Sequence, residues 1–409
     1  MIASAKRFLR DAAWANPTRL RNYFALLALA NLVGLAALAT YIRAGVDPRG
    51  EPLGTDFVSF WTAGRMALTG PAAAIYSPQA HHAAERALFG HPIDWYAFFY
   101  PPTYLLVCLP LGLLPYMGAL ALWLGASFAA MLAGLRALSR RFAHPLVVLA
   151  FPGMLATVGH GQNAFLTTAL FAGGASLLER RPLLAGVLFG ALGFKPQLAA
   201  VIPLGLLLAG RYRALAGMAA TGAALAAASV VAFGWDAWAA FLAETPLTRA
   251  TLERGLVDFA KMPSVYATLR ELGAGSPLAY AAQGLAALAA LGGLALALRR
   301  ERDARLQCAA IVVATCLTTP FLLDYDLTLL IVPIAVLAEA GLARGFRPFE
   351  ISVLAAAFLA PGFVRPLAQY AHLPVGPIVV AALGFVLLRR ALGHAPARAA
   401  ICRRDPLAA

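Results

Sequence analysis

Charged residues are scarce in this sequence of 409 residues. Only 13% are Asp, Glu, Lys or Arg, whereas a soluble domain usually carries about 25%. Acidic residues are the scarcer kind, with 19 Asp and Glu against 33 Lys and Arg, while hydrophobic residues make up 61% of the chain. The mean hydropathy is +0.74, and no polar stretch is long enough to form a soluble domain. The composition therefore predicts an integral membrane protein with a single membrane domain.

Several motifs of soluble enzymes are absent as well. The sequence holds no Walker motif, no dinucleotide-binding GxGxxG, no HExxH and no GxSxG. The basic residues form short clusters without interleaved aromatics, so the net charge of +14 does not predict a nucleic-acid partner. No metal ion or other cofactor is predicted. Disulfides and a zinc site are disfavoured because the cysteines lie in or beside apolar segments without a CxxC pair; they are Cys108, Cys308, Cys316 and Cys402.

The basic clusters separate the apolar runs and indicate the topology. Lys and Arg concentrate in cytoplasmic segments, and a basic cluster precedes the first apolar run, residues 23–42, which is long enough to cross a bilayer. We expect a cytoplasmic segment at residues 1–22, a transmembrane domain at 23–392 and a cytoplasmic tail at 393–409, in the inner (plasma) membrane. Further clusters lie at Arg136/Arg140/Arg141, Arg180/Arg181, Arg211/Arg213, Arg299/Arg300/Arg302/Arg305, Arg344/Arg347 and Arg389/Arg390.

Two successive basic clusters that both lie in the cytoplasm must be separated by an even number of membrane crossings. The apolar runs between them are therefore grouped in pairs. The predicted fold is all-α, a polytopic transmembrane bundle of about twelve helices, several of them short or broken. Pro110 and Pro115 are expected to divide residues 103–135 into a re-entrant piece and a full span. The pairs, with their outer turns, are 145–178 turning at 159–163, 182–210 turning near 195–196, 214–233 and 277–298 joined by a long loop, 306–343 turning at 319–326, and 351–392 turning at 365–374.

Two charged residues stand out at these outer segments, because unsatisfied polar groups are costly at membrane depth. Asp56 precedes a short run with helical spacing of apolar residues, which predicts an amphipathic helix lying at the membrane interface in the first outer loop. An aspartate there is also a common helix N-cap. Lys195 lies in an otherwise apolar stretch, where it needs an anionic partner such as a phosphate or carboxylate. The alternative is a lysine that snorkels to the surface.

Three further groups of polar residues fall at outer turns. His160, Gln162 and Asn163 could bind a polar ligand or satisfy a broken backbone. Asp324, Tyr325 and Asp326 lie between two short apolar helices; since residues i and i+2 do not share a helical face, at most one carboxylate is expected to point inward, and a surface loop is the alternative. Tyr100 lies in an aromatic run before two prolines and is typical of an interfacial aromatic belt.

Several of these segments resemble glycosyltransferase family 87, the polyprenol-phosphate-mannose-dependent mannosyltransferase relatives with the C-type glycosyltransferase fold. The resemblance spans most of the first half of the chain and is looser in the second, where the family often has a histidine at the position of the Asp324–Asp326 stretch. The resembling pieces are residues 54–61, residues 70–76, Phe99-Tyr100-Pro101-Pro102 with Trp123, Gly161-Gln162-Asn163, and residues 181–196.

The resemblance implies a membrane enzyme that transfers a hexose, mannose in the family, with inversion from a polyprenyl-phosphate donor to a glycolipid or glycan acceptor at the outer face. Asp56 matches the general base, and Lys195 is the candidate contact to the donor phosphate, since transfer needs a proton acceptor and a cation near the departing phosphate. Membrane lipids are the other expected partners. The competing hypothesis is a transporter or flippase of polar lipids or small solutes. The expected substrate-binding residues are His160, Gln162, Asn163, Tyr100, Asp324, Tyr325 and Asp326.

Overall fold

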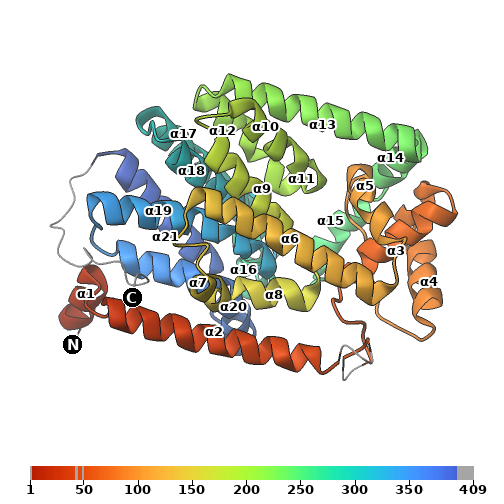
Figure 1. The fold of residues 1–409 in the computed structure, drawn as a ribbon, viewed down its shortest axis with the longest axis horizontal. Coiled ribbons are helices and arrows are strands. Elements are labelled where there is room, and N and C mark those ends of the chain that lie inside the picture. The colour runs from red at the N-terminus through yellow and green to blue at the C-terminus, as the bar shows by residue number, and fades with distance from the viewer. Residues whose placement is uncertain (1, 42–44, 48–49, 394–409) are drawn as a thin grey trace.

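The computed structural model describes residues 2–41, 45–47 and 50–393, and every element among them is helical apart from an isolated bridge between Val46 and Pro52. Within this part of the chain, six helical segments are long and apolar enough to cross a membrane. Several of them run in nearly the same direction, along the length of the molecule (Figure 1). The six segments are α2 (Pro17–Ala39), α6 (Tyr116–Leu138), α13 (Tyr212–Phe233), α17 (Ser276–Arg300), α20 (Glu350–Ala371), and the continuous pair η4 (Asp324–Leu330) and α19 (Ile331–Arg344).

Shorter helices complete the bundle. The structure confirms an all-α, multi-pass architecture, while the count of about twelve crossings stays a prediction. These elements are α1 (Ile2–Asp11), α3 (Phe57–Thr69), η1 (Ala72–Tyr76), α4 (Pro78–Phe89), α5 (Pro102–Leu111), α7 (Pro145–Ala150), α8 (Gly153–His160), α9 (Ala164–Leu177), α10 (Pro182–Ala191), η2 (Leu192–Phe194), α11 (Pro196–Ala199), α12 (Val201–Leu208), α14 (Trp235–Ala243), α15 (Thr245–Arg254), η3 (Phe259–Lys261), α16 (Val265–Glu271), α18 (Ala304–Thr318) and α21 (Gly376–Ala391).

Proline positions explain where most of the predicted breaks occur. α5 ends and α6 begins around Pro110 and Pro115, as expected from the sequence. The predicted turn at residues 365–374 begins later than expected, because α20 continues through Pro361 and Pro366 to Ala371 and α21 begins at Gly376. Proline is tolerated inside membrane helices where neighbouring helices pack against the weakened turn, and α20 packs against η4 and α21. The tail at 393–409 lies almost wholly outside the described residues.

Small residues allow α10 and α13 to pack closely. A Cβ atom on Gly186 of α10 would lie 2.0 Å from the carbonyl oxygen of Ala214, and one on Gly217 of α13 would lie 2.4 Å from that of Leu183. A larger residue in place of either glycine would force the two helices apart. Such contacts are typical of membrane helices, whose association depends on close packing rather than on exclusion of water.

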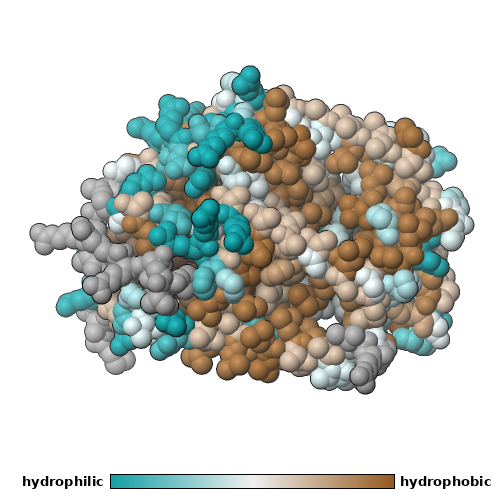
Figure 2. Space-filling model, in the orientation of Figure 1, coloured by the Kyte–Doolittle hydropathy of each residue, from teal (hydrophilic) through white to brown (hydrophobic). Residues whose placement is uncertain are grey.

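The basic clusters that separate the apolar runs meet at one end of the bundle. On the face shown in Figure 2, hydrophilic side chains gather toward the end where α1 lies, and hydrophobic ones cover the middle. The paired-helix prediction requires this grouping, because each pair of helices must return to the end from which it started. The contacts that join the clusters are Arg141 with Glu339 at 2.8 Å, Arg211 with Glu179 at 2.9 Å, Arg344 with Asp303 at 3.9 Å, and Arg305 with the carbonyl of Leu138 at 3.5 Å.

Candidate functional site

Two glycines bring the segment before α3 against the turn after α8. Gly161 ends α8 with a φ of 63°, and Gly54 has a φ of 73°; both are left-handed conformations that glycine adopts without steric cost. A Cβ atom on Gly161 would lie 2.6 Å from that of Phe57. The backbone N–H of Asp56 donates to the carbonyl of His160 at 3.1 Å. This close approach places Asp56 beside Gln162.

Asp56 lies directly before α3 but does not cap it. Its side chain makes no hydrogen bond to the helix backbone, so the N-cap interpretation is wrong. Instead, Oδ2 accepts a hydrogen bond from Nε2 of Gln162 at 2.8 Å. No hydrogen bond to Oδ1 is found among the described residues. One carboxylate oxygen is thus held in place and the other is left to face a ligand.

The helix that follows Asp56 is not amphipathic in its first two turns, contrary to the sequence prediction. Residues 57–64 of α3 are all buried. The reason is the packing of α3 on α5, where Gly64 and Gly112 let the two backbones approach so closely that a Cβ on Gly64 would lie 2.2 Å from the carbonyl oxygen of Cys108. Asp56 therefore stands on a rigid support inside the protein.

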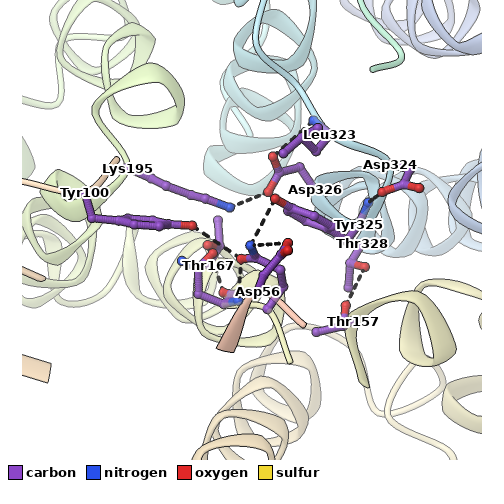
Figure 3. Close-up of polar contacts among 12 residues, drawn as sticks. Asp56, Tyr100, Thr157, Thr167, Lys195, Leu323, Asp324, Tyr325, Asp326 and Thr328 are labelled. Carbon is purple, nitrogen blue, oxygen red and sulfur yellow. Dashed lines mark hydrogen bonds and ion pairs between the residues drawn. The ribbon is translucent and has the colours of Figure 1, made fainter. Parts of the chain in front are cut away.

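Asp56, Tyr100 and Tyr325 point toward one another in Figure 3, and the amide group of Gln162 connects them. Its Nε2 donates to Asp56 and, at 3.0 Å, to the hydroxyl oxygen of Tyr325. The hydroxyl of Tyr100 donates to Oε1 of Gln162 at 3.3 Å, and the backbone N–H of Asn163 donates to the same oxygen at 3.0 Å. Burial raises the pKa of Tyr100 well above its usual value, so this phenol remains a hydrogen-bond donor. The network fixes the orientation of the Asp56 carboxylate.

Lys195 forms a buried ion pair with Asp326. Its Nζ lies 2.5 Å from Oδ1 of Asp326, and the two residues are 2% and 3% exposed. The snorkelling interpretation is therefore wrong, because the ammonium group does not reach the surface. The same Nζ lies 5.4 Å from the centre of the Tyr325 ring, and Oδ2 of Asp326 accepts the backbone N–H of Leu323 at 3.3 Å. The pair joins the turn before α11 to the beginning of η4.

Asp324 is also buried, at 5% exposure, so the surface-loop interpretation is wrong. Its Oδ1 accepts the backbone N–H of Tyr325 at 2.8 Å, and its Oδ2 lies 3.6 Å from Nη1 of Arg365 on α20. Both Asp324 and Asp326 line the same cavity, which corrects the expectation that only one would point inward. They reach different cations because side chains two residues apart in a 3₁₀ helix diverge.

These residues surround one cavity of about 490 Å³. Every candidate residue from the sequence lines it except Asn163, which is fully buried and whose Nδ2 donates to the hydroxyl of Tyr104 at 3.5 Å. Sequence reasoning missed several lining residues, Lys261 among them; a lone lysine between two helical segments was the available signal. The other lining residues that it missed are Ser59, Phe60, Asp94, Trp95, Tyr96, Ala97, Phe99, Gln197, Thr251, Leu256, Val257, Phe321 and Leu323.

The cavity has no donor set for a metal ion in the part of the chain that the structure describes. There, no group of three or more His, Cys, Asp or Glu side chains converges. Cys108, Cys308 and Cys316 are buried and unpaired, and Cys402 lies outside the described residues. The cavity lining offers carboxylates, phenols, amides, an imidazole and ammonium groups.

Comparison with known proteins identifies the family. Residues 98–320 match glycosyltransferase family 87, which is more than half of the chain and includes Gln162 and Lys195. Neither the curated proteins nor the solved structures yield a match. The apolar helices and this match together show a multi-pass membrane protein of a sugar-transferring family. The chain belongs to glycosyltransferase family 87 and is a membrane glycosyltransferase.

Proposed function

We propose that this enzyme transfers a hexose from a polyprenyl-phosphate donor to a glycolipid or glycan acceptor at the outer face of the membrane, with Asp56 as general base. The observation that carries the proposal is the Asp56 carboxylate, which lines the cavity with one oxygen fixed by Gln162 and the other free of hydrogen bonds among the described residues. Mannose is the proposed sugar on the basis of the family resemblance. Membership in a glycosyltransferase family favours this function over a transporter.

The proposed reaction is a single displacement with inversion. The acceptor hydroxyl oxygen attacks the anomeric carbon and forms the new C–O bond, while the bond between that carbon and the phosphate oxygen breaks. The hydroxyl proton passes to the free oxygen of Asp56, and the bonding electrons leave with the polyprenyl phosphate. General-base catalysis of this kind is worth about 10²–10⁴ in rate.

The network around Gln162 supports this role by positioning the base. Gln162 donates to Asp56 and to Tyr325, and it accepts from Tyr100. A carboxylate oriented by one fixed amide loses little freedom when the acceptor arrives, which is the advantage of a preorganised site. We propose that Tyr100, Gln162 and Tyr325 also border the bound sugar, with His160 and the Asp324–Asp326 segment beside them.

The proposed orientation places both termini in the cytoplasm and the cavity at the outer end, with about twelve crossings and a C-type glycosyltransferase fold. It is supported by the meeting of the basic clusters at one end of the bundle, through contacts such as Arg141–Glu339 and Arg344–Asp303. The cavity is built from the turns at the opposite ends of the same helix pairs, including the turn at Gly161 and the turn at Lys195.

The test is a transfer assay with the full chain reconstituted in lipid vesicles. Polyprenyl phosphates that carry radiolabelled mannose, glucose or galactose are each mixed with a membrane extract that supplies acceptors, and labelled glycolipid or glycan is separated from donor. We expect label from mannose above the other sugars and no product from the Asp56→Asn variant. An absence of labelled product from every lipid donor, with folded protein, would refute the proposal.

A further inference from the structure

The cation that binds the donor phosphate can be identified from the charges that line the cavity. Lys195 is the obvious candidate, but its ammonium group is already 2.5 Å from the Asp326 carboxylate, and both are almost fully buried. A phosphate dianion that approached this pair would meet a net charge of zero and the nearby carboxylate. The pair is therefore poorly suited to attract an anion.

Lys261 is a second cation on the same cavity. It ends η3, is half-buried, and forms no ion pair in the part of the chain that the structure describes. η3 packs against α20, which carries Arg365. Arg365 lies 3.6 Å from Asp324, and Lys261 is close enough to interact electrostatically with that carboxylate as well. Two cations thus face one carboxylate at this side, which leaves an excess of positive charge.

Acidic residues line the cavity as well. Asp56 and Asp94 both line it, and neither forms an ion pair within 4 Å in the described part of the chain. Lys261 is therefore a cation of the cavity lining whose charge no carboxylate pairs within 4 Å in the described part of the chain. A donor phosphate is attracted to Lys261 and repelled by Asp56 and Asp94.

Apolar side chains line the cavity next to Lys261. Val257, Phe321 and Leu323 are half-buried and pack on a small core separate from the main one, and Leu256 is 61% exposed. An ammonium group beside an apolar surface that continues to the outside matches an amphiphile with a phosphate head and a hydrocarbon chain. A soluble sugar phosphate or nucleotide would gain nothing from this surface.

We propose that Lys261, rather than Lys195, binds the phosphate of the lipid-linked donor, and that the lipid chain leaves the cavity over Leu256, Val257 and Phe321. The proposal rests on the proposed function for the identity of the donor. Arg365 neutralises Asp324, so that this carboxylate does not repel the phosphate. Lys195 then acts as a positioning residue that holds Asp326 and the beginning of η4.

The test measures binding, so that it does not depend on turnover. The purified full chain in detergent is titrated with farnesyl phosphate, with farnesol and with inorganic phosphate, and binding is followed by thermophoresis. We expect Lys261→Ala to weaken farnesyl phosphate binding about tenfold or more, the usual effect of losing a charge-assisted hydrogen bond. Farnesol binding should not change, and Lys261→Arg should retain most of the affinity for farnesyl phosphate.

The chain offers a matched control, since it contains only three lysines. Lys6→Ala removes the same charge from an exposed position on α1 and should leave farnesyl phosphate binding unchanged. Unaltered binding by Lys261→Ala would overturn the inference even if the enzyme transfers sugar. Equal losses of farnesol and farnesyl phosphate would overturn it too, because the phosphate would then not be the group recognised. Selective loss of farnesyl phosphate would support it even if the transfer assay gave no product.

Discussion

The buried ion pair between Lys195 and Asp326 makes a strong prediction about stability. Lys195→Met leaves the Asp326 carboxylate buried without a counter-charge, and Asp326→Asn leaves the ammonium group in the same state. Because the two residues are 2% and 3% exposed, each single variant should lose about 3–5 kcal/mol of unfolding free energy. In the double variant no charge is left unpaired, and the new amide still offers an oxygen to the Leu323 N–H. We expect the double variant to be more stable than either single variant.

The assay is a double-mutant cycle on the full chain in detergent micelles, with the unfolding free energy obtained by denaturant titration for all four proteins. The reasoning would be refuted by additive losses, since these would mean that Lys195 and Asp326 do not interact. Farnesyl phosphate binding provides a second readout. If the phosphate binds at Lys261, the double variant should bind within about threefold of the unmodified chain; a stable double variant that no longer binds would instead make Lys195 the phosphate contact.

Three other predictions concern the base, the turn beside it and the orientation. Asp56→Asn should lower the rate of transfer by about 10²–10⁴ with farnesyl phosphate binding unchanged, because the amide keeps the shape but cannot take a proton; Asp94→Asn, also on the cavity, is the control and should lose far less. Gly161→Ala should lose about 1–3 kcal/mol, read as a lower melting temperature, because its φ of 63° strains any other residue; Gly159→Ala in the same helix meets nothing within 4 Å and should be neutral. The orientation is tested in a chain without its native cysteines, with a thiol reagent that does not cross membranes. The reagent should label Asp94→Cys in intact cells and Arg140→Cys only after lysis. Labelling of both positions from one side would exclude the proposed orientation.

The sequence predicted the positions of several turns because their signals are local. Glycine at a helix end, proline at a helix start and a polar residue in an apolar run are each visible within a few positions. Gly161, Lys195 and the segment at Asp324 were found in this way, and all three turns contribute to one cavity. The turn at residues 365–374 was placed too early for the same reason, because proline is a local signal whose effect on α20 is overridden by tertiary packing.

The electrostatics of the cavity could not be predicted, because the pairing of its charges depends on residues far apart in the chain. Lys195 and Asp326 are 131 positions apart, and Asp324 is joined to an arginine of another helix. Before these contacts are known, Lys195 is a lone cation that needs an anion, and a phosphate satisfies that need as well as a carboxylate does. Because Lys195 is already paired with Asp326, a different cation is proposed to bind the phosphate.

The rarity of lysine is a signal that distinguishes two uses of positive charge in this chain. Among 33 basic residues only three are lysines, and two of these, Lys195 and Lys261, line the cavity. At the basic end of the bundle, arginines bind backbone carbonyls at helix ends, as Arg389 does with Pro348 and Arg305 with Leu138. The planar guanidinium, with five donors, suits that task, whereas an ammonium group is a compact point charge on a flexible chain. Where an anion must be bound and released again, a compact point charge is sufficient, which fits the role proposed for Lys261, whereas Lys195 uses the same kind of charge to hold Asp326.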